Sequence, residues 1–144
     1  MNISQEIEQA FSDLTKPDGK IFIEKEQDEG EEKYFRDRTW RNHSIKDLRY
    51  HAVAMILFTP EAHRYFLPAF MLGSLRDPES ADVIPDHILY HFADYKTEFW
   101  SQRVSILTAK QKGAVSRYLL HFHKYDRAHK SYLESALEGL SGSS

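Results

Sequence analysis

The stretch Phe58–Leu75, FTPEAHRYFLPAFMLGSL, decides the fold of this chain. Thr59 is suited to cap a helix, and Pro60 is suited to the first helical position, where its missing N–H leaves no hydrogen bond unmade. Apolar and small residues then share one broad face of the predicted helix: Ala62, Phe66, Ala69, Phe70 and Gly73. The stretch therefore predicts a central core helix. It does not predict a membrane span, because it is too short and contains Glu61 and Arg64.

Pro68 lies in the middle of this predicted helix. Its ring removes the hydrogen bond to the carbonyl of Arg64, which predicts a kink or a break at a cost of about 3 kcal/mol if nothing compensates. Two interpretations follow. The bend is either part of a core helix, which we favour, or the place where a polar site is built.

The size and composition of the chain indicate one folded domain. It has 144 residues, of which 41% are hydrophobic, which suffices for a packed core. Cysteine is absent, which excludes disulfides, thiolate metal ligands and a cysteine nucleophile. The N-terminus lacks the pattern of a secretory signal, and no apolar run reaches the roughly 18–20 residues of a membrane span. We therefore expect a cytoplasmic protein with a single domain at 1–140 and a flexible tail at 141–144.

Amphipathic spacing and capping residues predict an all-α, compact fold of about five to six helices. Strand signals are nearly absent. Besides the central helix, the predicted helices, each with its capping or first residue, cover 3–14 (Asn2), 45–55 (Ser44), a short segment through Phe92 (Pro85 or Asp86) and 109–137 (Thr108). Thr108 and Gln111 form the clearest capping box. Residues 109–137 fit either one helix or two with a break near Asp126.

Residues 18–43 form the least regular part of the sequence, with an acidic run followed by an aromatic stretch. We predict a long loop with one short helical turn, which either folds over the core or takes part in binding. The acidic side chains that we assign to a partner-binding loop are Glu24, Glu26, Asp28, Glu29, Glu31 and Glu32.

Charge is distributed unevenly, although the net charge is only −3. Residues 1–95 carry a net charge of −7 and residues 96–132 carry +6. Lys110, Arg117 and Lys124 form a basic stripe at seven-residue spacing. The pI of about 6.2 and the absence of a nucleic-acid-binding motif argue against a nucleic-acid partner. A solvated helix face accounts for the same residues.

The eight histidines supply a second candidate site. His87 and His91 are four residues apart, so both imidazoles face the same side of a helix, an arrangement that suits Zn²⁺. Asp86, His51 or His63 could supply a third ligand if the fold brings one of them near. The pair predicts, as an alternative to partner binding, a metal-binding protein or a metal-dependent enzyme. The favoured interpretation has no cofactor.

Three motifs resemble those of a family of small, uncharacterised bacterial proteins. They are the aromatic lead-in Tyr34–Trp40, the motif PEAHRYFLPAF at 60–70 and the cap LTAKQ at 107–111, and the similarity covers about residues 34–122. The resemblance implies a bacterial protein with one helical domain. It implies no particular activity.

This resemblance draws attention to Trp40, Glu61, Arg64 and Tyr65 as candidate binding residues, together with Pro68. A buried Arg64 paired with Glu61 or another carboxylate would be a structural explanation. A groove lined by Trp40, Arg64 and Tyr65 would be a binding one.

The sequence contains no nucleophile elbow, P-loop or dinucleotide-binding motif. Together with the acidic run, this predicts a non-enzymatic protein-interaction module, of an immunity type or a regulatory type. Its acidic loop would attract a basic protein partner. The oligomeric state is not indicated.

Overall fold

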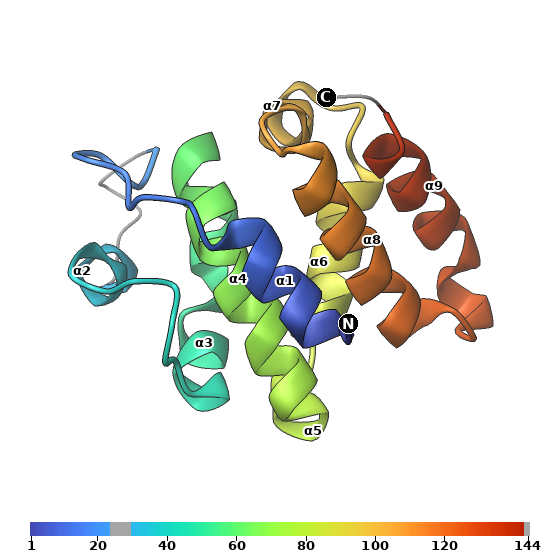
Figure 1. Ribbon diagram of the computed structural model, residues 1–144, viewed down its shortest axis with the longest axis horizontal. Coiled ribbons are helices and arrows are strands. Elements are labelled where there is room, and N and C mark those ends of the chain that lie inside the picture. The colour runs from blue at the N-terminus through green and yellow to red at the C-terminus, as the bar shows by residue number, and fades with distance from the viewer. Residues whose placement is uncertain (24–29, 143–144) are drawn as a thin grey trace.

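The predicted central helix is α4, Pro60–Arg76, and the other helices surround it (Figure 1). The computed structural model describes residues 1–23 and 30–142. Between Ala62 and Ser74 every residue of α4 except Arg64 is buried, so the helix contacts the core on all sides. The Thr59 hydroxyl accepts a hydrogen bond from the backbone N–H of Ala62, as the capping pattern predicts.

Pro68 does not break α4, which continues to Arg76. The proline itself is buried with its neighbours Leu67 and Ala69. The continuous helix agrees with our interpretation of this stretch as a core helix, because packing on all sides offsets the hydrogen bond that the ring removes.

The all-α class is confirmed, and the described residues form more helices than the five to six expected, because several of them have only one or two turns. The others are α1 Ile3–Phe11, α2 Glu31–Arg36, α3 Ile45–Tyr50, α5 Pro78–Ala81, α6 Ile84–Ala93, α7 Glu98–Ser105, α8 Ala109–His123, α9 Lys130–Leu140, and the 3-10 helices η2 Ala52–Ile56 and η3 Arg127–His129. Helix α7, capped by Thr97, has no counterpart among the sequence predictions.

Local capping explains most helix starts. Asn2 with Gln5, and Thr108 with Gln111, form reciprocal capping boxes at the starts of α1 and α8. Ser44 caps α3, but the predicted helix to Met55 divides at His51 into α3 and η2.

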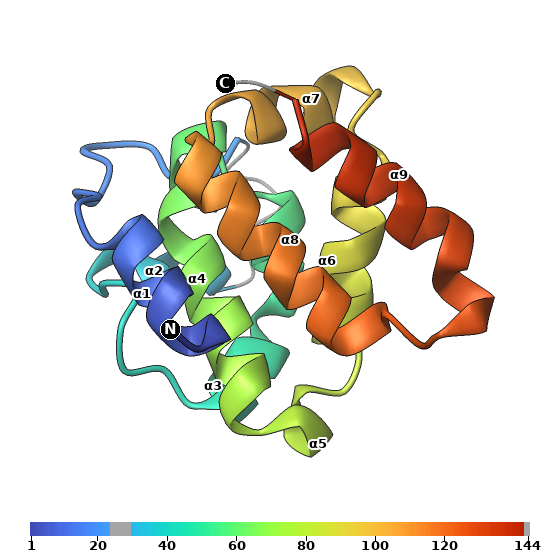
Figure 2. The ribbon, with the colours of Figure 1, turned by 45° about the vertical axis from the view of Figure 1, so that its right-hand side comes forward.

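The helices pack in two groups on either side of α4 (Figures 1 and 2). Short helices α2 and α3 lie on one side, and α6, α8 and α9 form the other. Helix α9 runs antiparallel to α8 and packs against both α8 and α6, while α1 packs against α4 and α8. The corner that joins α8 to α9 thus lies beside the first turn of α6.

Gly139 allows α9 to approach the connection between α6 and α7. A Cβ atom at this position would lie 2.4 Å from the ring of Tyr95, which is far inside contact distance. Only glycine fits at this position without moving the tyrosine or the helix.

The irregular segment folds over the core, which is one of the two alternatives that the sequence left open for it. Residues 21–23 run beside 57–59, with hydrogen bonds from Ile23 N–H to the Leu57 carbonyl and from Thr59 N–H to the Ile21 carbonyl, both 2.8 Å. Phe35 of α2 packs its ring against those of Phe58 and Phe66. Residues 24–29 of the acidic run, and 143–144 of the tail, lie outside the described residues.

No helix in the described part of the chain combines the length and the apolar character that a membrane span requires.

Candidate metal centre

The link between α8 and α9 is a tight corner built around Asp126. The chain divides here into two helices, which resolves the alternatives left by the sequence. The Asp126 N–H donates to the His123 carbonyl at 3.0 Å, and one oxygen of the Asp126 carboxylate accepts from the N–H of Ala128 at 3.1 Å. The corner therefore places His123 at the end of α8 and His129 just before α9.

Asp86, on the first turn of α6, completes a group of three side chains that could hold a metal ion. One donor atom each from Asp86, His123 and His129 lies within 4.8 Å of the other two. His123 is only 3% exposed, whereas the Asp86 side chain is 41% exposed. The group therefore has a buried wall and an opening to solvent.

The tautomer of His123 follows from its partners. Its Nε2 lies 3.0 Å from the carbonyl oxygen of Pro85, which can only accept, so Nε2 carries the hydrogen. The lone pair is then on Nδ1, which lies 3.9 Å from a carboxylate oxygen of Asp86. An imidazole that donates one N–H to a backbone carbonyl and turns the other nitrogen toward a carboxylate is oriented as metal-binding histidines are.

His129 is held in a similar way by a carboxylate. Its Nδ1 donates to Asp126, and its Nε2 lies 2.7 Å from the hydroxyl of Tyr90. The hydrogen bond to Asp126 raises the pKa of His129, and the same bond lowers the pKa of Asp126. With the hydrogen fixed on Nδ1, Nε2 has the free lone pair, and the Tyr90 hydroxyl can donate to it.

The arrangement offers two imidazole nitrogens and one carboxylate oxygen. This donor set suits Zn²⁺ and other divalent first-row metals rather than Mg²⁺ or Ca²⁺, which prefer oxygen ligands. Three protein ligands would leave a further coordination position, as in catalytic zinc sites, while structural zinc sites use four protein ligands.

A second group of histidines occupies the junction of α4, α6 and α7. The His91 ring stacks on Trp100 with centroids 4.2 Å apart, and the fully buried His63 meets the same indole edge-on at 5.6 Å. No carboxylate is among the causes that shift their pKa values. Burial lowers the pKa of His63 to about 3, helped by His91 and Arg103, and burial lowers that of His91 to about 4, helped by His87.

The histidines that we predicted as metal ligands are placed in this second group. His87 and His91 have ring centroids 6.3 Å apart, and the face of the His91 ring stacks on Trp100. Of the suggested third ligands, Asp86 belongs to the centre with His123 and His129, and His51 stacks on Tyr34 beside α2. Within the described residues, the structure does not bring a third ligand to the His87–His91 pair.

The four residues suggested by the resemblance are only partly brought together. Burial raises the pKa of Tyr65, and a hydrogen bond with the Trp40 backbone opposes this, so these two residues are neighbours. Arg64 instead donates to the Ile106 carbonyl at 3.1 Å, and Glu61 is exposed on the first turn of α4. Trp40 borders a hollow of about 100 Å³ whose lining includes neither Arg64 nor Tyr65.

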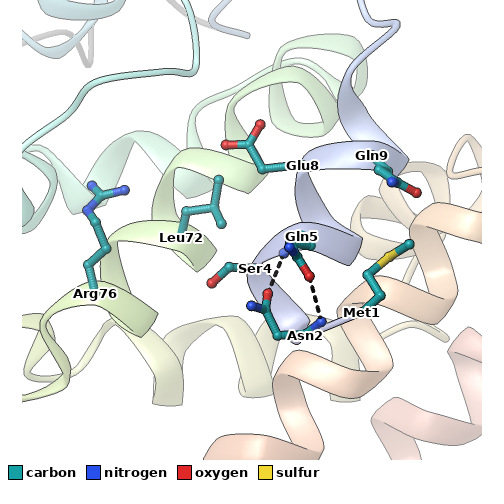
Figure 3. Close-up of a pocket in the computed structure, with 8 residues that line it drawn as sticks. All are labelled: Met1, Asn2, Ser4, Gln5, Glu8, Gln9, Leu72 and Arg76. Carbon is teal, nitrogen blue, oxygen red and sulfur yellow. Dashed lines mark hydrogen bonds between the residues drawn. The ribbon is translucent and has the colours of Figure 1, made fainter.

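A larger hollow of about 660 Å³ lies between the first residues of α1 and the end of α4 (Figure 3). Several of its polar groups already have partners. Asn2 and Gln5 form the α1 capping box, Glu8 pairs with Arg41, and Arg76 donates to the His43 carbonyl. The hollow therefore offers little chemistry of its own.

The acidic loop is described only at its end. Glu24, Glu26, Asp28 and Glu29 fall outside the described residues, while Glu31 is buried and Glu32 pairs with Arg36 at 2.5 Å. The protein-partner function that we expected from this loop stays a prediction.

The sequence patterns did not identify His123 and His129 as candidate metal ligands. Both were visible as histidines, and Asp126 was visible as a break between helices. What was missing was the packing of α8 and α9 against α6, which brings Asp86 within reach of residues about forty positions later.

The fold and the centre define an all-α domain with a candidate two-histidine, one-carboxylate metal site. The family of unknown function DUF6714 matches residues 1–138, and the chain belongs to this family. No curated protein and no solved structure matches the chain.

Proposed function

We propose that this protein binds a divalent transition metal, Zn²⁺ in the first instance, through Asp86, His123 and His129. The observation that carries the proposal is the convergence of three donor atoms within 4.8 Å. Each imidazole also has its other nitrogen held by a backbone carbonyl or a carboxylate. This is a metal-binding function of the kind that the sequence suggested, with Asp86, one of the suggested third ligands, but with two different histidines.

Charge supports the same proposal. Asp86 supplies one negative charge as a ligand, and Asp126 supplies a second through its hydrogen bond to His129. Two carboxylates balance the charge of a divalent ion, and an outer carboxylate makes the bound imidazole a better donor.

The open coordination position gives the bound metal a use. A water or a ligand atom in that position would be polarised by the ion, and a zinc-bound water has a pKa near 7. The neighbouring Tyr90 hydroxyl could then donate to or accept from that atom. The site therefore fits a metal-dependent activity better than a purely structural role.

Calorimetric titration with Zn²⁺ tests the proposal, using protein without a histidine tag and treated with EDTA. We expect one ion per chain. The variant Asp86→Asn keeps the size of the side chain and should weaken binding by more than about tenfold. Asp94→Asn, at the exposed end of the same helix, is the matched control and should have almost no effect.

His87→Gln separates this centre from the pair predicted from the sequence, and we expect it to leave the affinity unchanged. The proposal would be wrong if no stoichiometric binding is found, or if Asp94→Asn or His87→Gln weakens binding as much as Asp86→Asn does. Circular dichroism of each variant shows whether the fold is retained.

A further inference from the structure

A groove of about 380 Å³ lies between α8 and α9 beside the corner that joins them. Figure 2 shows these two helices running antiparallel in front of α6. Leu120 of α8 with Leu133 and Leu137 of α9 supply its apolar part. Leu120 is 36% exposed although it belongs to the wall of a groove, so apolar surface is open to solvent here.

The other side of the groove is basic. Lys124, Arg127 and Lys130 line it. Outside the corner, the lining contains one acidic residue, Glu134. Within residues 1–23 and 30–142 none of the three cations forms an ion pair. Helix α9 also begins here, and its first turn contains no acidic residue, so the positive end of its dipole adds to the field.

The other acidic residue in the lining, Asp126, forms no ion pair with these cations in the described part of the chain. Its carboxylate is already used by the N–H of Ala128 and the imidazole of His129. The groove thus combines an apolar wall with cations that lack a partner of opposite charge. Such a surface attracts an anion, and its apolar wall holds a hydrocarbon group.

The volume of the groove limits the size of the molecule that it can bind. About 380 Å³ is within the range of small-molecule sites, and the groove is bounded by the corner at one end. A peptide helix would need a longer channel.

We infer that this groove binds a small amphipathic anion, with a hydrocarbon chain against Leu120, Leu133 and Leu137 and a carboxylate among Lys124, Arg127 and Lys130. The inference goes beyond metal binding and does not depend on it, because none of these six side chains belongs to the metal centre. His123 and Asp126 line the groove as well, so its occupant would lie next to the centre.

Octanoate is the probe, titrated by calorimetry into protein kept free of metal with EDTA. We expect saturable binding of one octanoate per chain. Butyrate, which has the carboxylate without the chain, and octanamide, which has the chain without the charge, should each bind at least about tenfold more weakly.

The groove variant replaces all three cations: Lys124→Gln, Arg127→Gln and Lys130→Gln. Its matched control removes three exposed lysines elsewhere, by Lys33→Gln, Lys46→Gln and Lys110→Gln, and so has the same net charge. We expect the groove variant to lose at least about tenfold in octanoate affinity, and the control to change less than about twofold.

The inference is overturned if octanoate shows no saturable binding, if octanamide binds as tightly, or if the two triple variants lose affinity equally. Because all six replaced side chains are exposed, both variants should fold, and their thermal unfolding confirms this. Since the titrations contain no metal, a failure of metal binding at Asp86 leaves this result unaffected.

Discussion

Helix α6 separates two groups of histidines that have opposite electrostatic surroundings. Asp86 and Tyr90 contribute to the group with His129, where the carboxylate of Asp126 raises the imidazole pKa. On another face, His91 stacks on Trp100 near His63, and burial lowers the pKa of both histidines. An adjacent carboxylate, more than the histidine itself, therefore decides the direction in which the imidazole pKa shifts.

The largest expected difference between the two histidine groups is how much each lowers the stability of the fold at acidic pH. His63 and His91 are neutral when folded, but take a proton near pH 6.5 when unfolded. Stability is therefore unaffected above pH 6.5 and falls as the pH drops toward about 4 for His91 and about 3 for His63. Each histidine contributes up to about 1.4 kcal/mol per pH unit within its window.

Urea unfolding at several pH values measures this slope. His91→Phe keeps a ring on Trp100 and should remove about half of the histidine-dependent loss. His121→Gln, at an exposed position, should leave the slope as it is. Equal slopes in the wild type and His91→Phe would show that burial of this histidine is not the cause.

Arg103 provides the next largest effect, because it is the cation that borders the group without a carboxylate. It is 2% exposed, stacks on Phe99, and donates at 2.7 Å to the carbonyls of Phe58 and Phe99. Arg103→Ala leaves a cavity and buried carbonyl groups with fewer partners, so we expect a loss of about 3–5 kcal/mol in unfolding free energy. Chemical denaturation measures it.

Arg49→Ala is the comparison, since Arg49 forms an exposed ion pair with Asp82. It should cost less than about 1 kcal/mol. If the two substitutions cost the same, the buried arginine does not hold α7 against α4.

A smaller effect should follow from removing the carboxylate that distinguishes the metal centre. Asp126→Asn keeps the shape of the side chain but weakens its hold on His129, so the pKa of His129 should fall and Zn²⁺ affinity should drop by about 10- to 100-fold. Proton NMR titration of the imidazole and calorimetry provide the two measurements. An unchanged His129 pKa in this variant would contradict the assignment of Asp126 as its partner.

The smallest effect concerns the hydroxyl of Tyr90. Because this hydroxyl occupies the free nitrogen of His129, Tyr90→Phe should strengthen Zn²⁺ binding by roughly two- to tenfold, the range of one hydrogen bond. Tyr132→Phe is the control, since the Tyr132 ring also packs near His129. Weaker binding in Tyr90→Phe would show instead that the hydroxyl supports the metal.

The parts of the fold that could be predicted from sequence depend on local interactions. The caps at Asn2, Thr59 and Thr108 use partners three residues away, so the pattern alone contains them. Helix α7 escaped prediction because its buried face includes Arg103 where a hydrophobic residue would be expected. Its charge is accepted in the core because the carbonyl groups of Phe99 in α7 and of Phe58, between η2 and α4, receive its hydrogen bonds.

The centre could not be predicted for a related reason. His87 and His91 have the spacing of ligands, but within the described residues the fold brings no third donor to them. Asp86 and His123 are distant in sequence and meet because α8 packs against α6, while the corner at Asp126 turns the chain back so that His129 joins them. Tertiary packing decides which of the two histidine groups gathers three candidate ligands, and no short sequence pattern contains that information.

Gly139 lies far from the candidate metal centre, but a substitution there can affect the centre through helix α9. Helix α9 moves nearly as a rigid body, and the ten residue steps from His129 to Gly139 cover about 15 Å. Any side chain at position 139 would collide with Tyr95, so either the tyrosine or the helix would have to move. If the helix moves, its opposite end, next to His129, shifts relative to Asp86, so a one-methyl change far from the three donor residues would disturb the proposed metal site.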